Sequence, residues 1–342
     1  MTVRVGVIGT GMIGTDHIRR LTRSLSNVDV VAVTDVDMDR ARQVAAGAGG
    51  VAVLATGKDL IDSDAVDAVV VTSWGPTHEE YVLASIAAGK PVFCEKPLAT
   101  TRAACERILD AETAAGRRLV MVGFMRRYDA SYRDLRAVIA SGAIGAPLLV
   151  HCAHRNPTVP PSYSSDMAIN DTSVHEIDIV RWLLDEEIAA VRVLTPRRNS
   201  RAAGGLTDPL VLLMELAGGA LVDVEVSVNI GYGYDIRCEV VGEGGTAALA
   251  DNPGVIVRSG GRFGGAVPVD WRQRFVRAYD GELQDWLDAV AAGTTIGPSA
   301  WDGYAATVVA ETGLSALRTG ERVAVSLGSK PALYESGLAV AS

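Results

Sequence analysis

Three polar residues have the types and positions needed for acid-base chemistry on a hydroxyl group. Lys96 follows an apolar run at 91–94, so its ammonium group is expected at the carboxyl edge of a parallel sheet, where ligands bind. Asp171 and His175 are four residues apart at the start of an expected helix at 172–184, and this spacing points both side chains the same way. An imidazole can take a hydroxyl proton near neutral pH, while an ammonium group can stabilise the oxygen that loses it.

Simpler roles are open for the same residues. Lys96 precedes Pro97, so it could be a surface lysine before a turn. That proline also favours an extended backbone at Lys96 and makes a cis peptide bond possible. His175 could cap its helix or hydrogen-bond locally.

A glycine-rich turn marks a candidate dinucleotide site between an expected strand at 3–8 and the helix that follows it. Its residues fit the pattern G-x-G-x-x-G, with Gly9, Gly11 and Gly14 as the glycines and Met12 and Ile13 before the last of them. Such glycines permit a tight turn, let the backbone approach a pyrophosphate, and allow close packing of helix and strand.

Asp35 indicates which dinucleotide the turn would bind. It ends an expected strand at 28–34, where a carboxylate accepts hydrogen bonds from the adenosine ribose hydroxyls. The same charge repels a 2′-phosphate, so NAD is favoured over NADP. Arg40 and Arg42 would be the counter-evidence, but at helical positions after Asp37 they are expected to be solvated.

The first part of the chain, residues 1–122, alternates short apolar runs with longer helical patterns. The expected strands are at 3–8, 28–34, 66–72, 91–94 and 119–122. The run at 68–71 is apolar throughout, which is typical of strands with helices on both faces. The pattern predicts an α/β Rossmann domain with a doubly wound parallel sheet.

The second part, residues 123–342, has a different pattern. Helices are expected at 132–139, 172–184, 273–292 and 300–318, and extended segments at 147–153, 191–194, 210–216, 220–228, 235–241 and 255–257. Strands that follow one another with glycine-containing turns predict an α+β domain with a large open, mostly antiparallel sheet. The few helices could not cover both faces of this sheet, so we expect one face to be buried between subunits.

Composition excludes several classes of protein. Lys and Arg total 32 against 41 Asp and Glu, a net charge of −9, which argues against nucleic acid as a partner. Every apolar run is shorter than the ~20 residues that a membrane span requires. Cys94, Cys105, Cys152 and Cys238 show no CxxC spacing and are expected to be reduced and buried. With no leader before the first strand, we expect a cytoplasmic protein.

Taken together, the turn at 9–14, the Glu95-Lys96-Pro97 motif and the Asp171-x-x-x-His175 pair resemble the glucose-fructose oxidoreductase and inositol dehydrogenase (Gfo/Idh/MocA) family. Further segments are similar to the bacterial inositol 2-dehydrogenases within that family. They lie at 72–76, 123–129, 153–159, 175–178, 232–235 and 300–304, so the resemblance covers nearly the whole chain.

The resemblance implies a reaction and a set of site residues. The reaction is NAD-dependent oxidation of myo-inositol to 2-keto-myo-inositol by a cytoplasmic homotetramer without a metal. The implied catalytic residues are Lys96, Asp171 and His175, and the same three with Arg126, His154, Asn156 and Tyr234 would bind the polyol. Implied cofactor contacts are Gly9, Gly11, Met12, Ile13, Gly14, Asp35, Ser73, Trp74, Glu95 and Lys96.

Alternatives are open at two levels. Arg126 could pair with an acidic neighbour, Asn156 could serve its proline-rich loop, and Tyr234 could be an ordinary sheet aromatic. The chain could act on another cyclitol or sugar polyol, or be an NAD-binding sensor without turnover. The presence of all three catalytic positions argues against the sensor.

Overall fold

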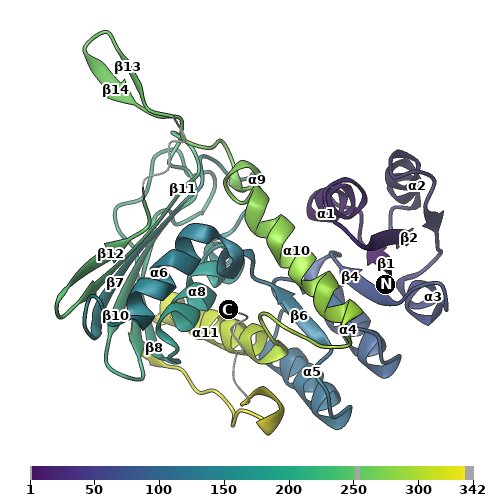
Figure 1. Cartoon of the computed structure of the whole chain (residues 1–342). Coiled ribbons are helices and arrows are strands. Elements are labelled where there is room, and N and C mark those ends of the chain that lie inside the picture. The colour runs from purple at the N-terminus through teal and green to yellow at the C-terminus, as the bar shows by residue number, and fades with distance from the viewer. Residues whose placement is uncertain (1, 251–254, 336–342) are drawn as a thin grey trace. The chain divides into compact units, whose positions relative to one another are not determined.

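The structure is a computed structural model that describes residues 2–250 and 255–335 (Figure 1). The chain divides into two compact units. Unit 1 contains the chain up to Phe124, the segment Tyr279–Thr307, and the described residues from Leu327 onward. Unit 2 contains Met125–Ala278 and Val308–Ser326.

Unit 1 is built on a six-stranded parallel sheet with the strand order β3-β2-β1-β4-β5-β6. The strands are β1 (Val3–Ile8), β2 (Val28–Thr34), β3 (Ala52–Val53), β4 (Ala68–Val71), β5 (Val92–Glu95) and β6 (Val120–Gly123). All residues of β4, β5 and β6 are buried, as expected for strands covered on both faces. The order is that of a dinucleotide-binding fold and confirms the predicted doubly wound sheet.

Helices connect these strands. They are α1 (Met12–Arg23), α2 (Met38–Gly47), α3 (Gly57–Asp62), α4 (His78–Ala87) after the short η1 (Gly75–Thr77), and α5 (Arg102–Ala114). Side chains cap several of them: Asp37 accepts from the Arg40 amide at α2, and Thr101 accepts from the Ala104 amide at α5. The later helices α10 (Val276–Ala291) and α11 (Ala300–Thr319) contribute residues to both units, and η4 (Ala332–Tyr334) belongs to unit 1.

Unit 2 is built on a seven-stranded sheet with the order β12-β11-β7-β10-β9-β8-β15. The strands are β7 (Pro147–Arg155), β8 (Ile188–Leu194), β9 (Leu210–Leu216), β10 (Leu221–Ser227), β11 (Asp235–Gly242), β12 (Gly245–Ala248) and β15 (Val323–Ala324). β7 and β10 are parallel, and the other neighbours are antiparallel, which confirms a mostly antiparallel sheet. Outward positions of β9 are partly exposed while alternate positions are buried, so one face is much less covered.

The helical segments of unit 2 between Phe124 and Ala278 are short. They are η2 (Met125–Tyr128), α6 (Ala130–Ala140), α7 (Ser165–Met167), the π-helical turn η3 (Ala168–Thr172), α8 (Val174–Leu184) and α9 (Trp271–Arg274). In Figure 1, α6 and α8 lie together over one face of the seven-stranded sheet.

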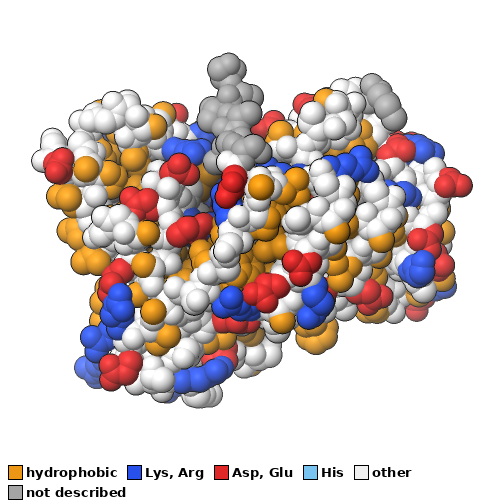
Figure 2. Space-filling view, turned by 90° about the horizontal axis from the view of Figure 1, so that it is seen from below, with side chains coloured by type: hydrophobic (Ala, Val, Ile, Leu, Met, Phe, Trp, Pro, Cys, Tyr) orange, Lys and Arg blue, Asp and Glu red, His pale blue; other side chains and the backbone are white. Residues whose placement is uncertain are grey.

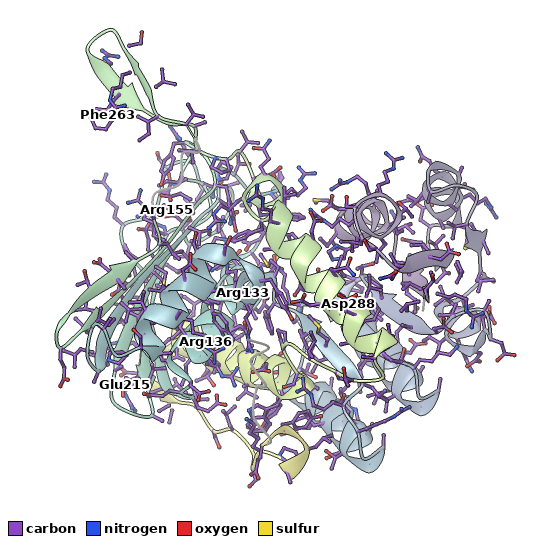
Figure 3. The ribbon with its side chains drawn as sticks, in the orientation of Figure 1. Arg133, Arg136, Arg155, Glu215, Phe263 and Asp288 are labelled. Carbon is purple, nitrogen blue, oxygen red and sulfur yellow. The ribbon has the colours of Figure 1, made fainter. Side chains whose placement is uncertain are left out.

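Several expectations for this unit were wrong in detail, among them the helix predicted at 273–292, which is interrupted at Phe275 between α9 and α10. The helix predicted at 172–184 begins at Val174, because the preceding residues form the wider π turn of η3. The strand predicted at 255–257 is displaced: β13 (Val257–Ser259) pairs with β14 (Arg262–Gly264) in a separate hairpin. This hairpin extends away from the sheet, and Phe263 on it is 78% exposed (Figures 1 and 3).

The charges on the surface are mixed. On the face in Figure 2, Lys and Arg side chains are interspersed with Asp and Glu side chains and with hydrophobic patches. A nucleic-acid site gathers cations along one track. The face shown has no such gathering.

Candidate active site

The glycine turn between β1 and α1 forms a cradle for a pyrophosphate. Gly9 has a φ of 97°, and a Cβ there would lie 2.6 Å from the Ser73 nitrogen. A Cβ on Gly14 would lie 2.0 Å from the Gly9 oxygen, so both positions exclude a side chain. Gly11 instead has open space around its would-be Cβ, at the N-terminal cap of α1. The turn therefore fits the group that the motif predicts.

Asp35 lies just after β2, and both oxygens of its carboxylate accept hydrogen bonds. Its Oδ2 accepts from the Thr10 amide at 2.6 Å, and its Oδ1 accepts from the Asp37 amide at 2.9 Å and from Arg40 at 2.6 Å. Burial works to raise the pKa of Asp35, but these donors outweigh it and hold that pKa below its usual value. Asp35 is an anion in a fixed orientation.

The structure corrects the expectation that Arg40 is only solvated. Its guanidinium forms an ion pair with Asp35, although 43% of its side chain is exposed. Arg42 pairs with Asp39 and is more exposed, as expected of a surface residue. Sequence spacing missed the Arg40 pair because the bond depends on how the loop between β2 and α2 turns.

Three loops follow the neighbouring strands β1, β4 and β5 at the carboxyl edge of the sheet. Thr72 Oγ1 donates to the Gly9 oxygen at 2.7 Å and so fastens the loop after β4 to the glycine turn. Ser73 and Trp74 follow, and Trp74 is 78% exposed, so its indole is accessible to a ligand. These loops bring the predicted cofactor residues of unit 1 to one edge.

The Glu95-Lys96-Pro97 turn is anchored through Glu95. Its Oε1 lies 2.8 Å from Nε2 of His17 on α1, and its Oε2 accepts from the Lys96 amide at 3.1 Å. Glu95 and His17 are both buried, whereas Lys96 is half-buried. The Lys96-Pro97 peptide bond is cis, as the sequence allowed. Lys96 therefore lies on a turn whose backbone is held by the buried carboxylate of Glu95.

Asp171 and His175 lie in unit 2, on either side of a change in helix type. Asp171 belongs to the π turn, where the Ser173 amide donates to the Ala168 oxygen, and His175 is the second residue of α8. The imidazole of His175 is largely buried, and its ring centre lies 6.2 Å from that of His154. The two residues therefore lie on either side of the junction between a π turn and an α-helix.

A buried cluster surrounds His154 on β7. Glu176 forms an ion pair with Arg126, and its Oε2 lies 3.0 Å from Nδ1 of His154. Arg126 also lies 3.1 Å from the same Nδ1. When Nδ1 carries the hydrogen and donates to Glu176, Nε2 becomes the acceptor nitrogen of the neutral ring. The acidic neighbour proposed as an alternative partner of Arg126 is thus Glu176.

The charges of this cluster control its protonation. Burial works to raise the pKa of Glu176, but Arg126 and His154 outweigh it and hold that pKa at about 2. Burial raises the pKa of Tyr234 to about 12, although Arg126 opposes it. At neutral pH Glu176 is therefore ionised and Tyr234 carries its proton, so the phenol can donate a hydrogen bond.

Tyr234 and Asn156 occupy the ends of neighbouring strands. The Tyr234 ring packs edge-on against His154, with centres 5.6 Å apart, just before β11 begins. The Asn156 amide donates to the Ser227 oxygen at 2.8 Å, so its backbone serves the loop after β7. Tyr234 thus lies beside His154, and the polyol contacts predicted for Tyr234 and for the Asn156 side chain stay predictions.

Sequence reasoning missed three buried polar residues: His17, His78 and Glu176. The first two contact the backbone or side chains of the loops after β4 and β5, and the third neutralises Arg126. Each lies within five residues of a predicted site residue: His17 near Gly14, His78 near Trp74 and Glu176 next to His175. A polar residue on the buried stripe of a helix was the available signal.

Among the described residues, no helix is long and apolar enough to cross a membrane. Within the same residues, no three His, Cys, Asp or Glu side chains are grouped so that they could hold a metal ion.

Comparison with known proteins shows what the chain is similar to. Residues 3–124 match the model of an oxidoreductase family with an NAD-binding Rossmann fold, and residues 136–325 match that family's C-terminal alpha/beta domain. Inositol 2-dehydrogenase 3 of Saccharopolyspora erythraea is 58% identical over 334 residues, which are 98% of each chain. Inositol 2-dehydrogenase of Pseudomonas fluorescens is 54% identical over 98% of this chain and 100% of its own.

A solved structure agrees with these relatives. Myo-inositol dehydrogenase from Lactobacillus casei, in complex with NAD(H) and myo-inositol, is 40% identical and superposes with a TM-score of 0.96. The match covers 98% of this chain and 100% of the other. The chain therefore belongs to the Gfo/Idh/MocA family of NAD-binding oxidoreductases.

Proposed function

We propose how the residues of this chain perform its reaction, the NAD-dependent oxidation of myo-inositol to 2-keto-myo-inositol (scyllo-inosose). The observation that carries the assignment is the match over 98% of the chain to a dehydrogenase solved with NAD(H) and myo-inositol. Lys96, Asp171 and His175 are the residues to which we assign the chemistry.

The cofactor is held by unit 1, within residues 1–122. The amides of the turn from Gly9 to Gly14, with Met12 and Ile13 at the start of α1, bind the pyrophosphate. Asp35 accepts from the adenosine ribose, and Ser73, Trp74 and the Glu95-Lys96 turn contact the nicotinamide half. When bound, NAD accepts the hydride from the reacting carbon.

The proton moves through residues of this chain. His175 takes the proton of the reacting hydroxyl as general base. Lys96 donates a hydrogen bond to the same oxygen as it gains negative charge. Asp171 supports the imidazolium that His175 becomes. The reaction balances with one hydride to NAD and one proton to His175.

Polyol recognition is assigned to unit 2, within residues 123–342. His154 accepts from one substrate hydroxyl through Nε2, and its ring is fixed by Glu176 at Nδ1. Tyr234 donates to another hydroxyl, and Asn156 contacts the ring edge. Arg126 is buried against Glu176, and its charge keeps that carboxylate ionised. A donor and an acceptor at fixed positions suit a substrate whose neighbouring carbons each carry a hydroxyl.

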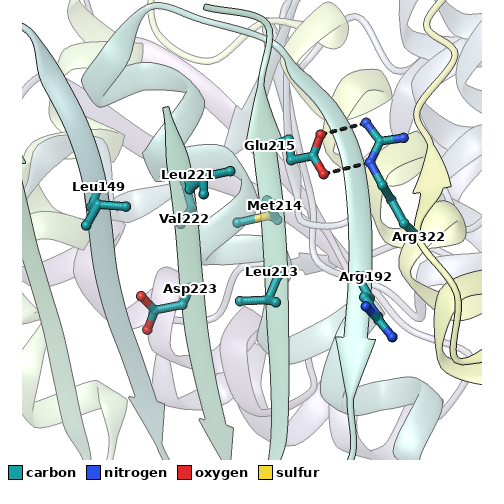
Figure 4. A pocket seen from close by; sticks show the side chains of 9 residues that line it. All are labelled: Leu149, Arg192, Leu213, Met214, Glu215, Leu221, Val222, Asp223 and Arg322. Carbon is teal, nitrogen blue, oxygen red and sulfur yellow. Dashed lines mark hydrogen bonds and ion pairs between the residues drawn. The ribbon is translucent and has the colours of Figure 1, made fainter. Parts of the chain in front are cut away.

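The assembly that we propose is a homotetramer in which the less covered face of the seven-stranded sheet meets a second copy. Its outward leucines are 38–50% exposed: Leu149, Leu213 and Leu221. They line a groove of about 380 Å³ that also contains the Arg322–Glu215 ion pair (Figure 4). An apolar surface of this kind, rimmed by charges, is typical of a subunit interface.

A cytoplasmic location is supported by the cysteines. Cys94, Cys105, Cys152 and Cys238 are all free and buried in the structure. The sulfur atoms of Cys152 and Cys238 lie 3.7 Å apart without forming a disulfide. Reduced thiols are typical of a reducing compartment.

The test of the reaction is an assay of NADH absorbance with the purified chain and NAD. Myo-inositol should give the highest kcat/KM, above scyllo-inositol and glucose. Faster turnover of another polyol would assign the chain to that substrate instead. NAD binding without turnover of any of them would favour a sensor.

A further inference from the structure

His78 joins two loops at the carboxyl edge of the parallel sheet. Its Nδ1 lies 2.7 Å from the Pro97 carbonyl oxygen, and its Nε2 lies 3.0 Å from the Ser73 carbonyl oxygen. Ser73 follows β4 and Pro97 follows β5, and these strands are neighbours in the sheet. The histidine is only 1% exposed, so water does not compete for either carbonyl.

Both partners of His78 can only accept hydrogen bonds. A ring nitrogen therefore bonds its carbonyl only when it carries a hydrogen. The imidazolium bonds both carbonyls, and the neutral ring bonds one in each tautomer. In every form, the ring is a donor to at least one of the two loops and fills the space between them.

Other contacts fix the Ser73 loop on its far side. Ser73 Oγ lies 2.7 Å from Thr77 Oγ1, which donates to the Trp74 oxygen at 2.7 Å. Gly9 approaches the Ser73 backbone so closely that a Cβ would lie 2.6 Å from its nitrogen. A continuous path of contacts thus runs from the glycine turn through Ser73 and His78 to Pro97.

Pro97 is the residue after Lys96, so this path ends at the proposed oxyanion donor. We propose that His78 is a positioning residue, which holds the Lys96 turn in register with the glycine turn and the Ser73 loop. His78 acts through the backbone and does not touch the substrate. The inference rests on the proposed role of Lys96.

The expected consequence is selective for the chemical step. The glycine turn and Asp35, which hold the adenosine and pyrophosphate, also have contacts outside the Ser73 and Pro97 loops: Asp35 accepts from the Thr10 and Asp37 amides, and the Gly9 amide donates to the Thr34 oxygen. Removing His78 should therefore displace Lys96 without loss of the ADP half of the cofactor site. A misplacement of about 1 Å at a reacting group costs roughly 10²-fold in rate.

Two substitutions at this position separate hydrogen bonding from packing. His78→Phe keeps a ring and removes every N–H donor at this position, whereas His78→Gln keeps an amide donor. Ser85→Ala is the matched control, because Ser85 is equally buried on the same helix and its hydroxyl donates to the Tyr81 oxygen of that helix, away from the Ser73 and Pro97 loops. The measurements are kcat and KM with myo-inositol and NAD, and the Kd of ADP-ribose by calorimetry.

We expect His78→Phe to lower kcat by roughly 10- to 100-fold. The Kd of ADP-ribose should stay within about 2-fold, and His78→Gln should recover part of the lost kcat. Ser85→Ala should match the parent. A His78→Phe variant with parental kcat would overturn the proposal. Equal losses of kcat and of ADP-ribose binding would also overturn it, because they indicate a general structural role.

A double variant tests whether His78 acts through Lys96. If it does, His78→Phe combined with Lys96→Ala should be no slower than Lys96→Ala alone. Independent, multiplicative losses would contradict the proposal. The outcome for the function is separate: a parent without turnover of myo-inositol refutes the reaction, and an unimpaired Lys96→Ala refutes the role of the lysine.

Discussion

The guanidinium of Arg40 donates a hydrogen bond of 2.6 Å to Asp35, the carboxylate proposed to bind the adenosine ribose. This pair places a cation next to the position that a 2′-phosphate would occupy. In the parent, Asp35 holds that cation and repels the phosphate. Loss of the carboxylate would release Arg40 to a phosphate, because arginine binds phosphate through charge-assisted hydrogen bonds.

Cofactor preference should therefore depend on both residues. Asp35→Ser should lower kcat/KM with NAD and raise it with NADP, each by roughly 10-fold for a charge-assisted hydrogen bond lost or gained. Adding Arg40→Ala to Asp35→Ser should remove the gain with NADP. The measurement is kcat/KM for both cofactors at saturating myo-inositol.

Arg42→Ala is the control for this series, since Arg42 lies two residues further along α2 and pairs only with Asp39 among the ion pairs described. It should leave the preference unchanged. If the parent uses NADP as well as NAD, or if Arg40→Ala has no effect in the Asp35→Ser background, the roles assigned to this pair are wrong.

The ion pair between Arg126 and Glu176 should make stability depend on pH. The pKa of Glu176 is about 2 in the folded chain against an ordinary 4.5. A depressed pKa stabilises the fold above the ordinary pKa, and this stabilisation is lost as the pH falls from 4.5 toward 2. Glu176→Gln should destabilise the chain at pH 7, by about 3–5 kcal/mol for a broken buried pair.

Urea unfolding at pH 7 and at pH 3.5 checks this prediction. The gap in unfolding free energy between parent and Glu176→Gln should be smaller at pH 3.5 than at pH 7. Glu106→Gln, which removes an exposed pair with Arg102, should change little at either pH. A gap that grows on acidification would show that Glu176 is not held as an anion.

The outward face of the seven-stranded sheet should determine the oligomeric state. Leu213→Lys together with Leu221→Lys places two charges on the proposed interface and should convert tetramers to smaller species. Val138→Lys is a suitable control, because Val138 on α6 is 37% exposed, close to the 38% of Leu213. Light scattering at micromolar concentration measures the mass. A monomeric parent would refute the interface.

Much of unit 1 could be predicted because local patterns determine its elements. The strands expected at 3–8 and 28–34 match β1 and β2 residue for residue, since apolar runs between glycines and helices leave few alternatives. The glycine pattern likewise marked Gly9 and Gly14 as positions without room for a side chain. No local sequence pattern indicated that residues 279–307 belong to unit 1.

The rest of the site depends on contacts between distant segments. His17 and Glu95 are 78 residues apart, and Arg126 and Glu176 are 50 apart. Local sequence spacing therefore cannot predict either contact. The short edge strands β3 and β15 were missed because two residues give no periodicity. The π turn at Asp171 was missed because its residues are also compatible with an α-helix.

The central claim is that His175 takes the hydroxyl proton, and His175→Ala tests it most directly. Steady-state NADH formation is measured from pH 6 to 10 with saturating myo-inositol and NAD, and NAD binding is followed by fluorescence. His151→Ala is the control, as His151 is a half-exposed histidine of the same unit, paired with Asp223. We predict a loss in kcat of ~10² to 10⁴-fold, unchanged NAD binding, and a flattened pH dependence near neutrality. A His175→Ala variant that keeps more than about a tenth of the parental kcat would contradict the account.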